Sequence, residues 1–287
     1  MKIKIRSNLL KKVIKTFLID PISGIFVSIL KLLKIIDFPV PPNSSMRKTT
    51  ASGNIFTYYN SGSSYLPIAT MAEKYGLNLR EKNLNILDFG CGVGRLLLHF
   101  TRVYKSNKYF ACDVDDTSIS FLLKNYPNVD SHTNNYSPPI KYEDSKFDMI
   151  YALSIFSHLD ISDQALWLKE LSRITKSGGY LFLTIEGYHA LNIWLYKDLG
   201  LNKDEAFKKL EKEGYIFAPY NNWEETVQES NILKNASQLR GVKKPYGMMV
   251  IDKSFIKKNW NKYNLEVVDI IEGIITTRQD LVVLRKK

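Results

Sequence analysis

The sequence predicts an α/β protein built on a parallel sheet, and three observations favour this class. Residues 84–98 have the pattern of a short apolar strand, a glycine-rich turn and the start of a helix. Residues 108–112 have the pattern of a second strand, and acidic residues follow it. Strand and helix patterns then alternate as far as residue 185, which is typical of parallel strands joined by helices.

The individual elements follow from apolar spacing and from glycine and proline breaks. A turn is expected at 58–62. Besides the opening strand at 84–87, strands are predicted at 108–112, 149–153 and 180–185, and helices at 65–75, 95–102, 117–125 and 163–176. Ser177-Gly178-Gly179 is expected to close the last of these helices.

The glycine turn contains the pattern Asp88-x-Gly90-x-Gly92-x-Gly94. Glycine lets a ligand approach the backbone closely, and a turn before a helix presents backbone N–H groups. The dinucleotide fingerprint G-x-G-x-x-G would place its third glycine at position 95, which is Arg95. The spacing therefore counts against a nicotinamide cofactor.

Asp113 ends the second predicted strand, 19 positions after Gly94. A ribose-binding acid is expected roughly 20 residues after such a turn. The alternative is that Asp113, Asp115 and Asp116 are loop acids that cap the next helix. The position favours ribose binding for Asp113 and a helix-end role for Asp116.

The turn resembles motif I of class I S-adenosylmethionine-dependent methyltransferases. The likeness covers residues 41–186 and 246–287, and it extends to one bacterial branch that is often associated with glycosyltransferases in surface-glycan synthesis. One departure is that Thr184-Ile185-Glu186-Gly187 stands where relatives often carry Thr-x-His-Gly, so no role of that histidine transfers. The matching segments include Pro41-Pro42, Pro138-Pro139-Ile140, Phe147-Asp148, Ser154-Ile155-Phe156-Ser157-His158-Leu159, Trp167-Leu168-x-Glu170-Leu171, Gly178-Gly179 and Gln279–Arg285.

The resemblance implies a Rossmann-like sheet of seven strands with helices on both faces and a hairpin as its last two strands. The sequence offers 265–271 and 281–284 for that hairpin, with Gly273 in the turn. Residues 1–48 would form a basic helical extension and residues 49–287 the methyltransferase domain.

Residues 187–246 would be an inserted acceptor lid, or alternatively a structural elaboration. The insert contains its own predicted helix. Asn202 is the expected N-cap, Glu205 completes a capping box, and Gly214 ends the helix.

The resemblance also implies S-adenosylmethionine as the cofactor and assigns its contacts. Gly90, Gly92 and Gly94 would approach the methionine and ribose, and Asp88 would orient the loop or reach the amino group. Asp113 would accept the ribose hydroxyls. The remaining expected contacts are Val114 on the adenine face, Asn134 or Asn135 at the adenine amine, and Arg95 or Arg47 at the methionine carboxylate.

A hydroxyl acceptor needs a group that takes its proton, and histidine suits that task. His158 follows the strand predicted at 149–153 and is the first candidate, against a helix-capping or core role. The strand predicted at 180–185 ends at the same sheet edge and is followed by Glu186, Tyr188 and His189. Glu186 and His189 are therefore further catalytic candidates. His99 and His132 are interpreted as structural, on a helix and in a loop respectively. Neither the choice between O- and N-methylation nor the need for a base follows from the sequence.

The net charge of +11 lies mostly at the N-terminus, because residues 1–48 carry +8 and the remaining chain only +3. A near-neutral catalytic domain disfavours binding to nucleic acid phosphates. Amino-methyltransferases that act on nucleic acid carry an (Asp/Asn/Ser)-Pro-Pro-(Tyr/Phe) motif after the strand that corresponds to 149–153. The segment Ser137-Pro138-Pro139-Ile140 precedes that strand and lacks the aromatic residue, so it does not qualify. A small-molecule or glycan acceptor is therefore expected. The alternatives left open are a polysaccharide-assembly adaptor that keeps the fold, and an NAD(P)-dependent oxidoreductase.

The N-terminus is expected to be neither a cleaved signal nor a membrane span. Its longest apolar run, residues 21–30, is about half of the ~20 residues needed to cross a bilayer. Residues 9–18 instead have one apolar helix face beside lysines, which predicts either contact of residues 1–20 with an anionic membrane or packing on the domain. Cys91 and Cys112 match no metal-ligand spacing and are expected to be reduced packing residues of a cytoplasmic protein without a metal site. Membrane contact of residues 1–20 would place this protein at the inner face of the membrane.

Overall fold

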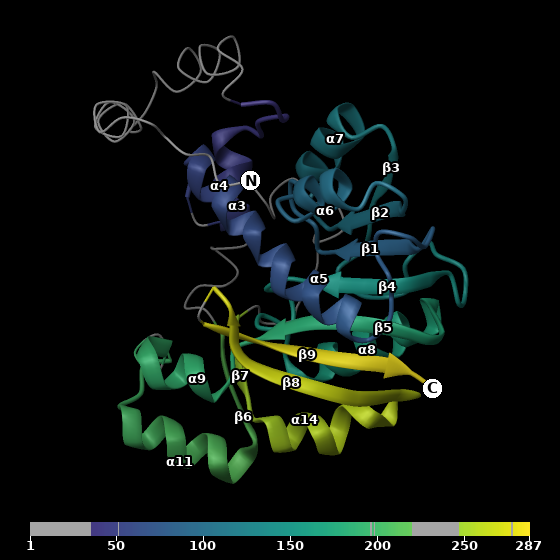
Figure 1. The fold of residues 1–287 in the computed structure, drawn as a ribbon. Coiled ribbons are helices and arrows are strands. Elements are labelled where there is room, and N and C mark those ends of the chain that lie inside the picture. The colour runs from purple at the N-terminus through teal and green to yellow at the C-terminus, as the bar shows by residue number, and fades with distance from the viewer. Residues whose placement is uncertain (1–35, 51, 196, 198, 220–246, 277) are drawn as a thin grey trace.

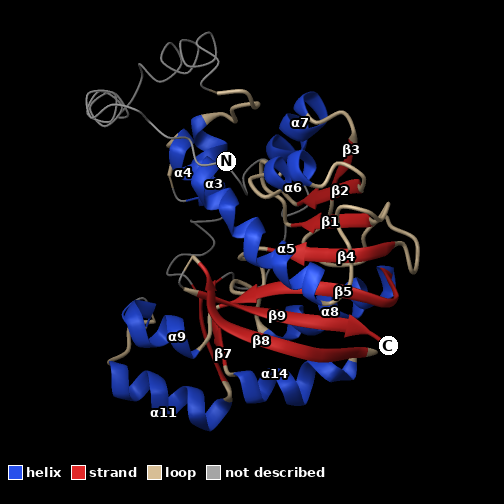
Figure 2. Ribbon diagram, viewed as in Figure 1, coloured by secondary structure: helices blue, strands red, loops and turns tan. Residues whose placement is uncertain are grey.

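The fold was analysed in a computed structural model that describes residues 36–50, 52–195, 197, 199–219, 247–276 and 278–287. Its main sheet has seven strands in the order β3-β2-β1-β4-β5-β9-β8 (Figures 1 and 2). β1 to β5 are parallel, and β9 runs antiparallel to both β5 and β8. The α/β prediction with a terminal hairpin is thereby confirmed. The strands are β1 (Asn85–Phe89), β2 (Lys108–Asp113), β3 (Val129–Thr133), β4 (Phe147–Ala152), β5 (Thr175–Ile185), β8 (Leu265–Ile275) and β9 (Gln279–Lys286).

Helices cover both faces of this sheet because its strands are apolar on both sides. Phe182 packs in one hydrophobic cluster, whereas its neighbours Leu181 and Leu183 pack in the other. The Phe182 side is covered by α5 (Tyr65–Lys74), α6 (Leu97–Val103) and α7 (Asp116–Asn125), and the opposite side by α8 (Ile161–Ile174) and α14 (Lys253–Asn259).

Two further helices precede α5. They are α3 (Asn43–Thr50) and α4 (Ile55–Ser61), followed by a 3-10 turn at Gly62–Ser64. The turn predicted at 58–62 is wrong, because Asn54 caps a helix there by accepting from Phe56 N and Thr57 N. Tyr58 is fully buried, and its hydroxyl donates to Val93 O at 2.9 Å. Burial of this face keeps the segment helical beside the glycine turn.

Three local expectations are corrected. His132 lies in β3, paired with Cys112 of β2, and not in a loop. β5 already begins at Thr175, so the double glycine lies within a strand, where Gly178 has φ +78°. Gly273 lies inside β8, where the pairing with β9 shifts register, and not in the connecting turn. Sheet pairing holds His132 in β3, whereas both glycine positions lie where the pairing with the neighbouring strand is interrupted and the strand then continues.

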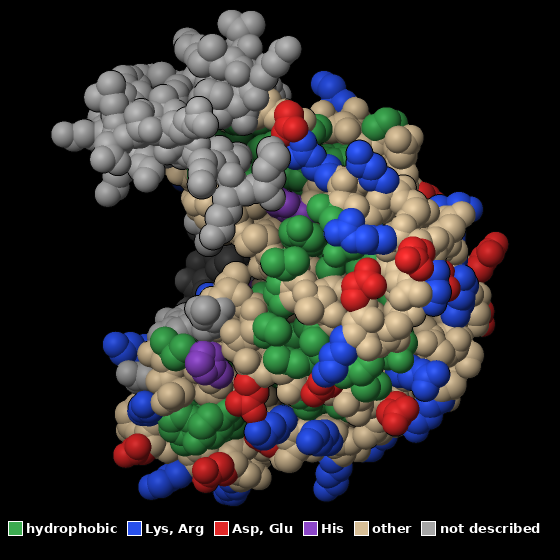
Figure 3. All heavy atoms as spheres, viewed as in Figure 1, with side chains coloured by type: hydrophobic (Ala, Val, Ile, Leu, Met, Phe, Trp, Pro, Cys, Tyr) green, Lys and Arg blue, Asp and Glu red, His purple; other side chains and the backbone are tan. Residues whose placement is uncertain are grey.

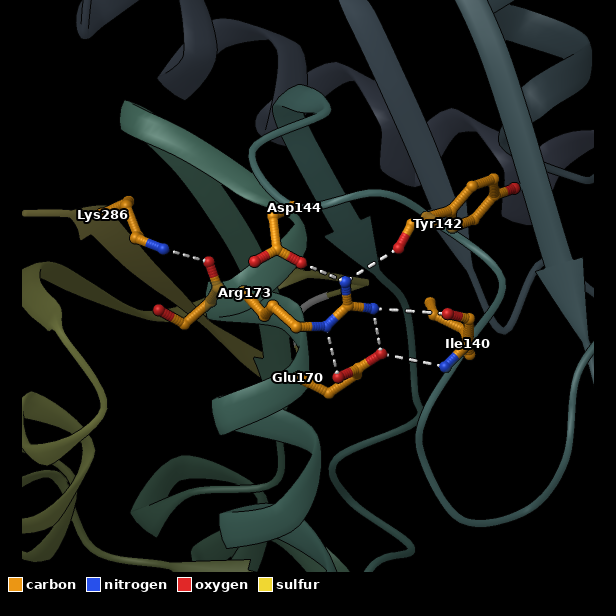
Figure 4. A network of polar contacts seen from close by, with 7 residues as sticks. Ile140, Tyr142, Asp144, Glu170, Arg173 and Lys286 are labelled. Atoms are coloured by element: carbon orange, nitrogen blue, oxygen red, sulfur yellow. Dashed lines mark hydrogen bonds and ion pairs between the residues drawn. The ribbon is translucent and has the colours of Figure 1, made fainter.

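An ion-pair network fixes the loop before β4 to α8 (Figure 4). Arg173 donates to both carboxylate oxygens of Glu170, to Asp144 and to the carbonyls of Ile140 and Tyr142. Glu170 in turn accepts from Ile140 N at 2.9 Å. Glu170, which belongs to the motif after Trp167, therefore holds the loop and is not part of the site.

The predicted insert and the strand that follows it form a small unit with its own apolar core. It comprises α9 (Tyr188–Ala190), a π-helical turn at Leu191–Leu195, α11 (Lys203–Glu213), and the antiparallel strands β6 (Tyr215–Pro219) and β7 (Gly247–Ile251). The predicted capping box of Asn202 and Glu205 is confirmed, as is the left-handed Gly214 with φ +79°. The two strands had no clear sequence signal.

The predicted N-terminal helices lie almost wholly outside the described residues. Within the described part, Ile36 and Phe38 are buried against Met46, Ile55 and Tyr58. None of the helices in that part combines the length and hydropathy of a membrane span.

Candidate active site

The glycine turn lies at the carboxyl end of β1 and is anchored to β2. Gly90 N and Cys91 N both donate to Cys112 O, at 2.9 and 3.1 Å. Gly90, Gly92 and Gly94 have φ values of +71°, +50° and +76°. This left-handed backbone explains why three glycines alternate in the turn.

The turn is also closely packed. A Cβ atom on Gly90 would collide with the side chain of Ile155, and one on Gly92 would lie 2.8 Å from Thr49 Oγ1. Thr49 belongs to α3 and Ile155 to the segment after β4. Sequence reasoning missed both neighbours because they are distant in the chain.

Asp113 is hydrogen-bonded directly to this turn. Its Oδ2 accepts from Gly92 N at 2.7 Å, and its Oδ1 accepts from Asp115 N at 2.9 Å. Burial raises the pKa of Asp113 to about 6. Asp115 caps α7 by accepting from Thr117 N and Ser118 N, so the capping alternative describes Asp115 and not Asp113.

Asp88 and Arg95 bring opposite charges to the same end of β1. Asp88 is 4% exposed, and its burial raises the pKa to about 7 against the opposing effect of Arg95. Burial likewise lowers the pKa of the Arg95 guanidinium to about 10, with Asp88 opposing. The two groups therefore form an electrostatically coupled pair inside the protein.

Asn134 follows β3 and is fixed beside Asp113, because Asn134 N donates to Asp113 O at 3.0 Å. Its Nδ2 donates to Asn135 O, whereas its buried Oδ1 has no partner among the described residues. Val114 is half-buried next to Asp113. Asn135 is exposed, as is Arg47 on α3, so neither is held at the turn.

A second polar cluster lies at the carboxyl ends of β4 and β5. Ser154 N donates to Thr184 Oγ1 at 2.7 Å, and Ser154 Oγ donates to Gln279 Oε1 at 3.0 Å. Gln279 Nε2 then donates to Glu186 Oε1 at 3.0 Å. The molecule is hollowed on the side to which these strands point (Figure 3).

Glu186 is 1% exposed and paired with Arg278 of the β8–β9 connection. Arg278 Nε and Nη2 lie 3.1 and 2.8 Å from Glu186 Oε1. The other oxygen, Oε2, has no hydrogen-bond partner in the described part of the chain. Burial raises the pKa of Glu186, and Arg278 counteracts this by stabilising the carboxylate.

His158 lies in the same region. Its Nδ1 is 3.0 Å from Gly247 O. A carbonyl can only accept, so Nδ1 carries the hydrogen and the neutral ring has its lone pair at Nε2. Burial lowers the pKa of His158, which favours this neutral form at pH 7. The helix-capping alternative is wrong, because Asp160 caps α8 by accepting from Asp163 N.

His189 and Tyr188 lie in α9, at the rim. The His189 ring is 3.0 Å from the position of a Cβ on Gly273. The Tyr188 ring packs at an angle of 41° against the ring of Phe207, and Tyr188 is 47% exposed. Nearby Asp280 accepts from Gly273 N, and burial raises its pKa to about 6.

The structural interpretation of His99 is confirmed. Its Nε2 lies 3.0 Å from Tyr59 O, and its ring stacks on Tyr65 at 5.1 Å. Cys91 and Cys112 are buried free thiols. Burial raises the pKa of both thiols, so neither is a reactive thiolate.

Residues 86–179 match a family model described as a methyltransferase domain. The mitochondrial ubiquinone biosynthesis O-methyltransferase of Dictyostelium discoideum is 29% identical over 124 residues, which are 39% of this chain and 38% of the relative. A methyltransferase of Invertebrate iridescent virus 6, 235L, is 25% identical over 138 residues, 47% of this chain and 49% of the relative. The chain thus matches half or less of the length of these curated relatives.

A solved structure from Listeria monocytogenes, described as an S-adenosylmethionine dependent methyltransferase, has a similar fold. The TM-score is 0.52 at 12% identity, covering 80% of this chain and 99% of that chain. At this identity the likeness concerns the fold alone. Residues 86–179 thus resemble a methyltransferase domain, and the chain has the fold of the Listeria structure.

Proposed function

We propose that the protein transfers a methyl group from S-adenosylmethionine to a hydroxyl of a small-molecule or glycan acceptor. The observation that carries this proposal is the hydrogen bond between Asp113 and Gly92. It joins the glycine turn to the acid that is expected to bind the ribose. The name of the Dictyostelium relative, an O-methyltransferase, supports a hydroxyl acceptor.

The residues at the turn fit the cofactor. A carboxylate has about four acceptor sites, so Asp113 can accept from ribose hydroxyls while keeping its two backbone partners. The buried Asn134 Oδ1 is an acceptor that matches the adenine amine. Val114 would lie on the adenine face. Arg95 would hold the methionine carboxylate and Asp88 its amino group, each compensating a buried charge.

The bound cofactor supplies an activated methyl group on a positively charged sulfur. The protein then has to align the acceptor and remove its proton. His158 is available to accept this proton at Nε2, because burial lowers its pKa and so keeps the ring neutral, and the neutral tautomer has its lone pair there. Glu186 is held by Arg278, which suits binding of the acceptor better than proton transfer.

The rim of the site supports an acceptor that has an apolar portion, as a lipid-linked glycan does. Tyr188, Ile193 and Ile274 are large apolar side chains with exposed fractions of 47%, 52% and 37%. Tyr188 and Ile274 adjoin His189 and Gly273, which pack together. Apolar groups gathered beside a polar site are typical of binding surfaces.

Methyl-labelled S-adenosylmethionine and a glycolipid extract of the host test the function. Mass spectrometry is expected to find a labelled product, and calorimetry is expected to show binding of S-adenosylmethionine and not of NAD. Binding of NAD alone would contradict the cofactor assignment. Cofactor binding with no product from any extract would favour the adaptor.

We further propose that residues 1–20, which lie outside the described part, bring this cytoplasmic enzyme to an anionic membrane. Lysines beside an apolar helix face support this, at about 1 kcal/mol per nearby basic residue. Full-length protein should sediment with anionic liposomes at low salt, and a chain beginning at Asn43 should not. Full-length protein that ignores anionic liposomes would refute the membrane contact.

A further inference from the structure

The strand β7, which begins directly after the predicted insert, contacts the histidine that follows β4. His158 Nδ1 lies 3.0 Å from the carbonyl oxygen of Gly247, the first residue of β7. Two residues further along β7, Met249 N donates to Ser157 O at 2.8 Å. β7 is therefore hydrogen-bonded both to the backbone beside His158 and to its ring.

The same strand also contacts the end of β5. Ile251 N donates to Glu186 O at 3.0 Å, and Glu186 forms an isolated parallel bridge with Val250. β7 thus joins the two segments that carry the candidate catalytic residues. It lies outside residues 86–179, which match the methyltransferase domain model, so this contact comes from the rest of the chain.

The close fit of β7 against β6 explains why its first residue is glycine. A Cβ on Gly247 would collide with Ala218 O and would lie 2.8 Å from Pro219 Cα. The φ of Gly247 is not left-handed, so proximity and not backbone strain excludes a side chain. A larger residue would push β7 away from β6 and shift its carbonyl relative to His158.

We propose that β7 is the positioning element of the catalytic base: the Gly247 carbonyl fixes His158 as the Nδ1–H tautomer and so directs the Nε2 lone pair toward the acceptor. This inference rests on the proposed role of His158 as general base. In this proposal β7, which lies outside the matched segment 86–179, decides whether the ring can accept a proton.

The charges around His158 are consistent with a neutral ring. Burial lowers the pKa of His158, and among the described residues the positive charge of Arg278 acts in the same direction. Arg278 is itself paired with Glu186, which moderates the positive charge. The Gly247 carbonyl has the opposite effect, because it stabilises the hydrogen on Nδ1.

Long-range ¹H–¹⁵N correlation spectra of protein labelled in its four histidines test the tautomer directly and need no acceptor. His158→Asn assigns the signal. Above the pKa of His158, the wild-type ring is expected as the Nδ1–H tautomer. Gly247→Ala should lose this preference. Lys208→Ala, at an exposed position of α11, is the control in the insert.

An Nε2–H tautomer in the wild type, or an unchanged Nδ1–H tautomer in Gly247→Ala, would overturn the proposal. If Gly247→Ala does not fold, the exchange rate of the His158 Nδ1 proton in the wild type tests the contact. A proton that is hydrogen-bonded to a carbonyl exchanges slowly, so rapid exchange would refute the contact. Calorimetry with S-adenosylmethionine separates the two claims. A wild-type protein that binds no cofactor would overturn the proposed function and leave the tautomer result standing.

Discussion

The cofactor half and the acceptor half of the site are assembled in different ways. At the turn, the key hydrogen bond joins Gly92 and Asp113, which are 21 residues apart. At the acceptor edge, Ser154 contacts Gln279 across 125 residues, and Glu186 contacts Arg278 across 92. The first half is therefore one βαβ unit, whereas the second needs the whole chain.

The two halves of the site therefore also depend on different parts of the chain. In the proposed function, the turn and the acid after β2 bind the nucleoside of the cofactor, and such a βαβ unit can be retained while the rest of the chain changes. The acceptor edge depends on β7, β9 and the insert, which lie outside the segment matched by the family model. Changes in one half are expected to leave the other largely unaffected.

The largest expected effect is on turnover in the acceptor half. His158→Ala should lower kcat by about 10²- to 10⁴-fold, the usual contribution of a general base, and leave cofactor affinity unchanged. Rates with labelled cofactor and calorimetry measure the two quantities. His189→Ala, at the rim, is the control and should cost less than about tenfold if general-base catalysis rests on His158. Near-normal turnover in His158→Ala would return the role to Glu186 or His189, or to no base.

In the cofactor half, Asp88→Asn should change the pH dependence of stability. The folded pKa of Asp88 is about 7 and its ordinary value is 3.8. The folded protein therefore holds a proton that the unfolded chain releases. This stabilisation is complete below pH ~4 and is lost as the pH rises through 7. The difference between the folded and the ordinary pKa corresponds to a stability change of about 4 kcal/mol at most.

The neutral asparagine removes this loss, so the variant without cofactor should be more stable than the wild type at pH 8 and similar at pH 4. Urea denaturation over this range measures the difference, with Asp116→Asn as the control. Parallel wild-type and Asp88→Asn profiles would show that Asp88 ionises normally.

Asp113→Ala should weaken cofactor binding by about 10- to 100-fold, since it leaves the ribose hydroxyls and Gly92 N without an acceptor, at about 1–3 kcal/mol. Calorimetry measures the affinity, and circular dichroism establishes that the variant is folded. Asp116→Ala, three residues further on, should bind normally. Unchanged affinity in a folded Asp113→Ala protein would remove this residue from the site.

The smallest effect is expected in the insert. Asn202→Ala removes the N-cap of α11 and should destabilise that helix by about 1 kcal/mol. Faster amide exchange confined to α11, with unchanged cofactor affinity, is the expected result. Lys208→Ala on the exposed side of α11 should leave exchange unchanged. Equal protection in Asn202→Ala and wild type would show that the cap contributes little.

No range was predicted for β3, and the seven-strand sheet with its hairpin was implied by the family resemblance. The sequence by itself determined the strand before the glycine turn, the turn itself and the capped helix of the insert. Each has a signal within about ten residues: alternating glycines that need positive φ, an apolar strand before them, or Asn202 followed by Glu205. The acid that accepts from the turn was found as well, because a βαβ unit fixes the distance between its first two strand ends.

Only the tertiary structure decided the partners of those residues. The pairing of Glu186 with Arg278 and the contact of His158 with Gly247 join segments 92 and 89 residues apart, and no local pattern predicts them. The helix at Ile55–Ser61 and the early start of β5 have the same origin, since burial and strand pairing outweighed the turn residues. Residues that are close in sequence specify the glycine turn. The surroundings of His158 and Glu186 depend instead on the distant segments that the fold packs against them.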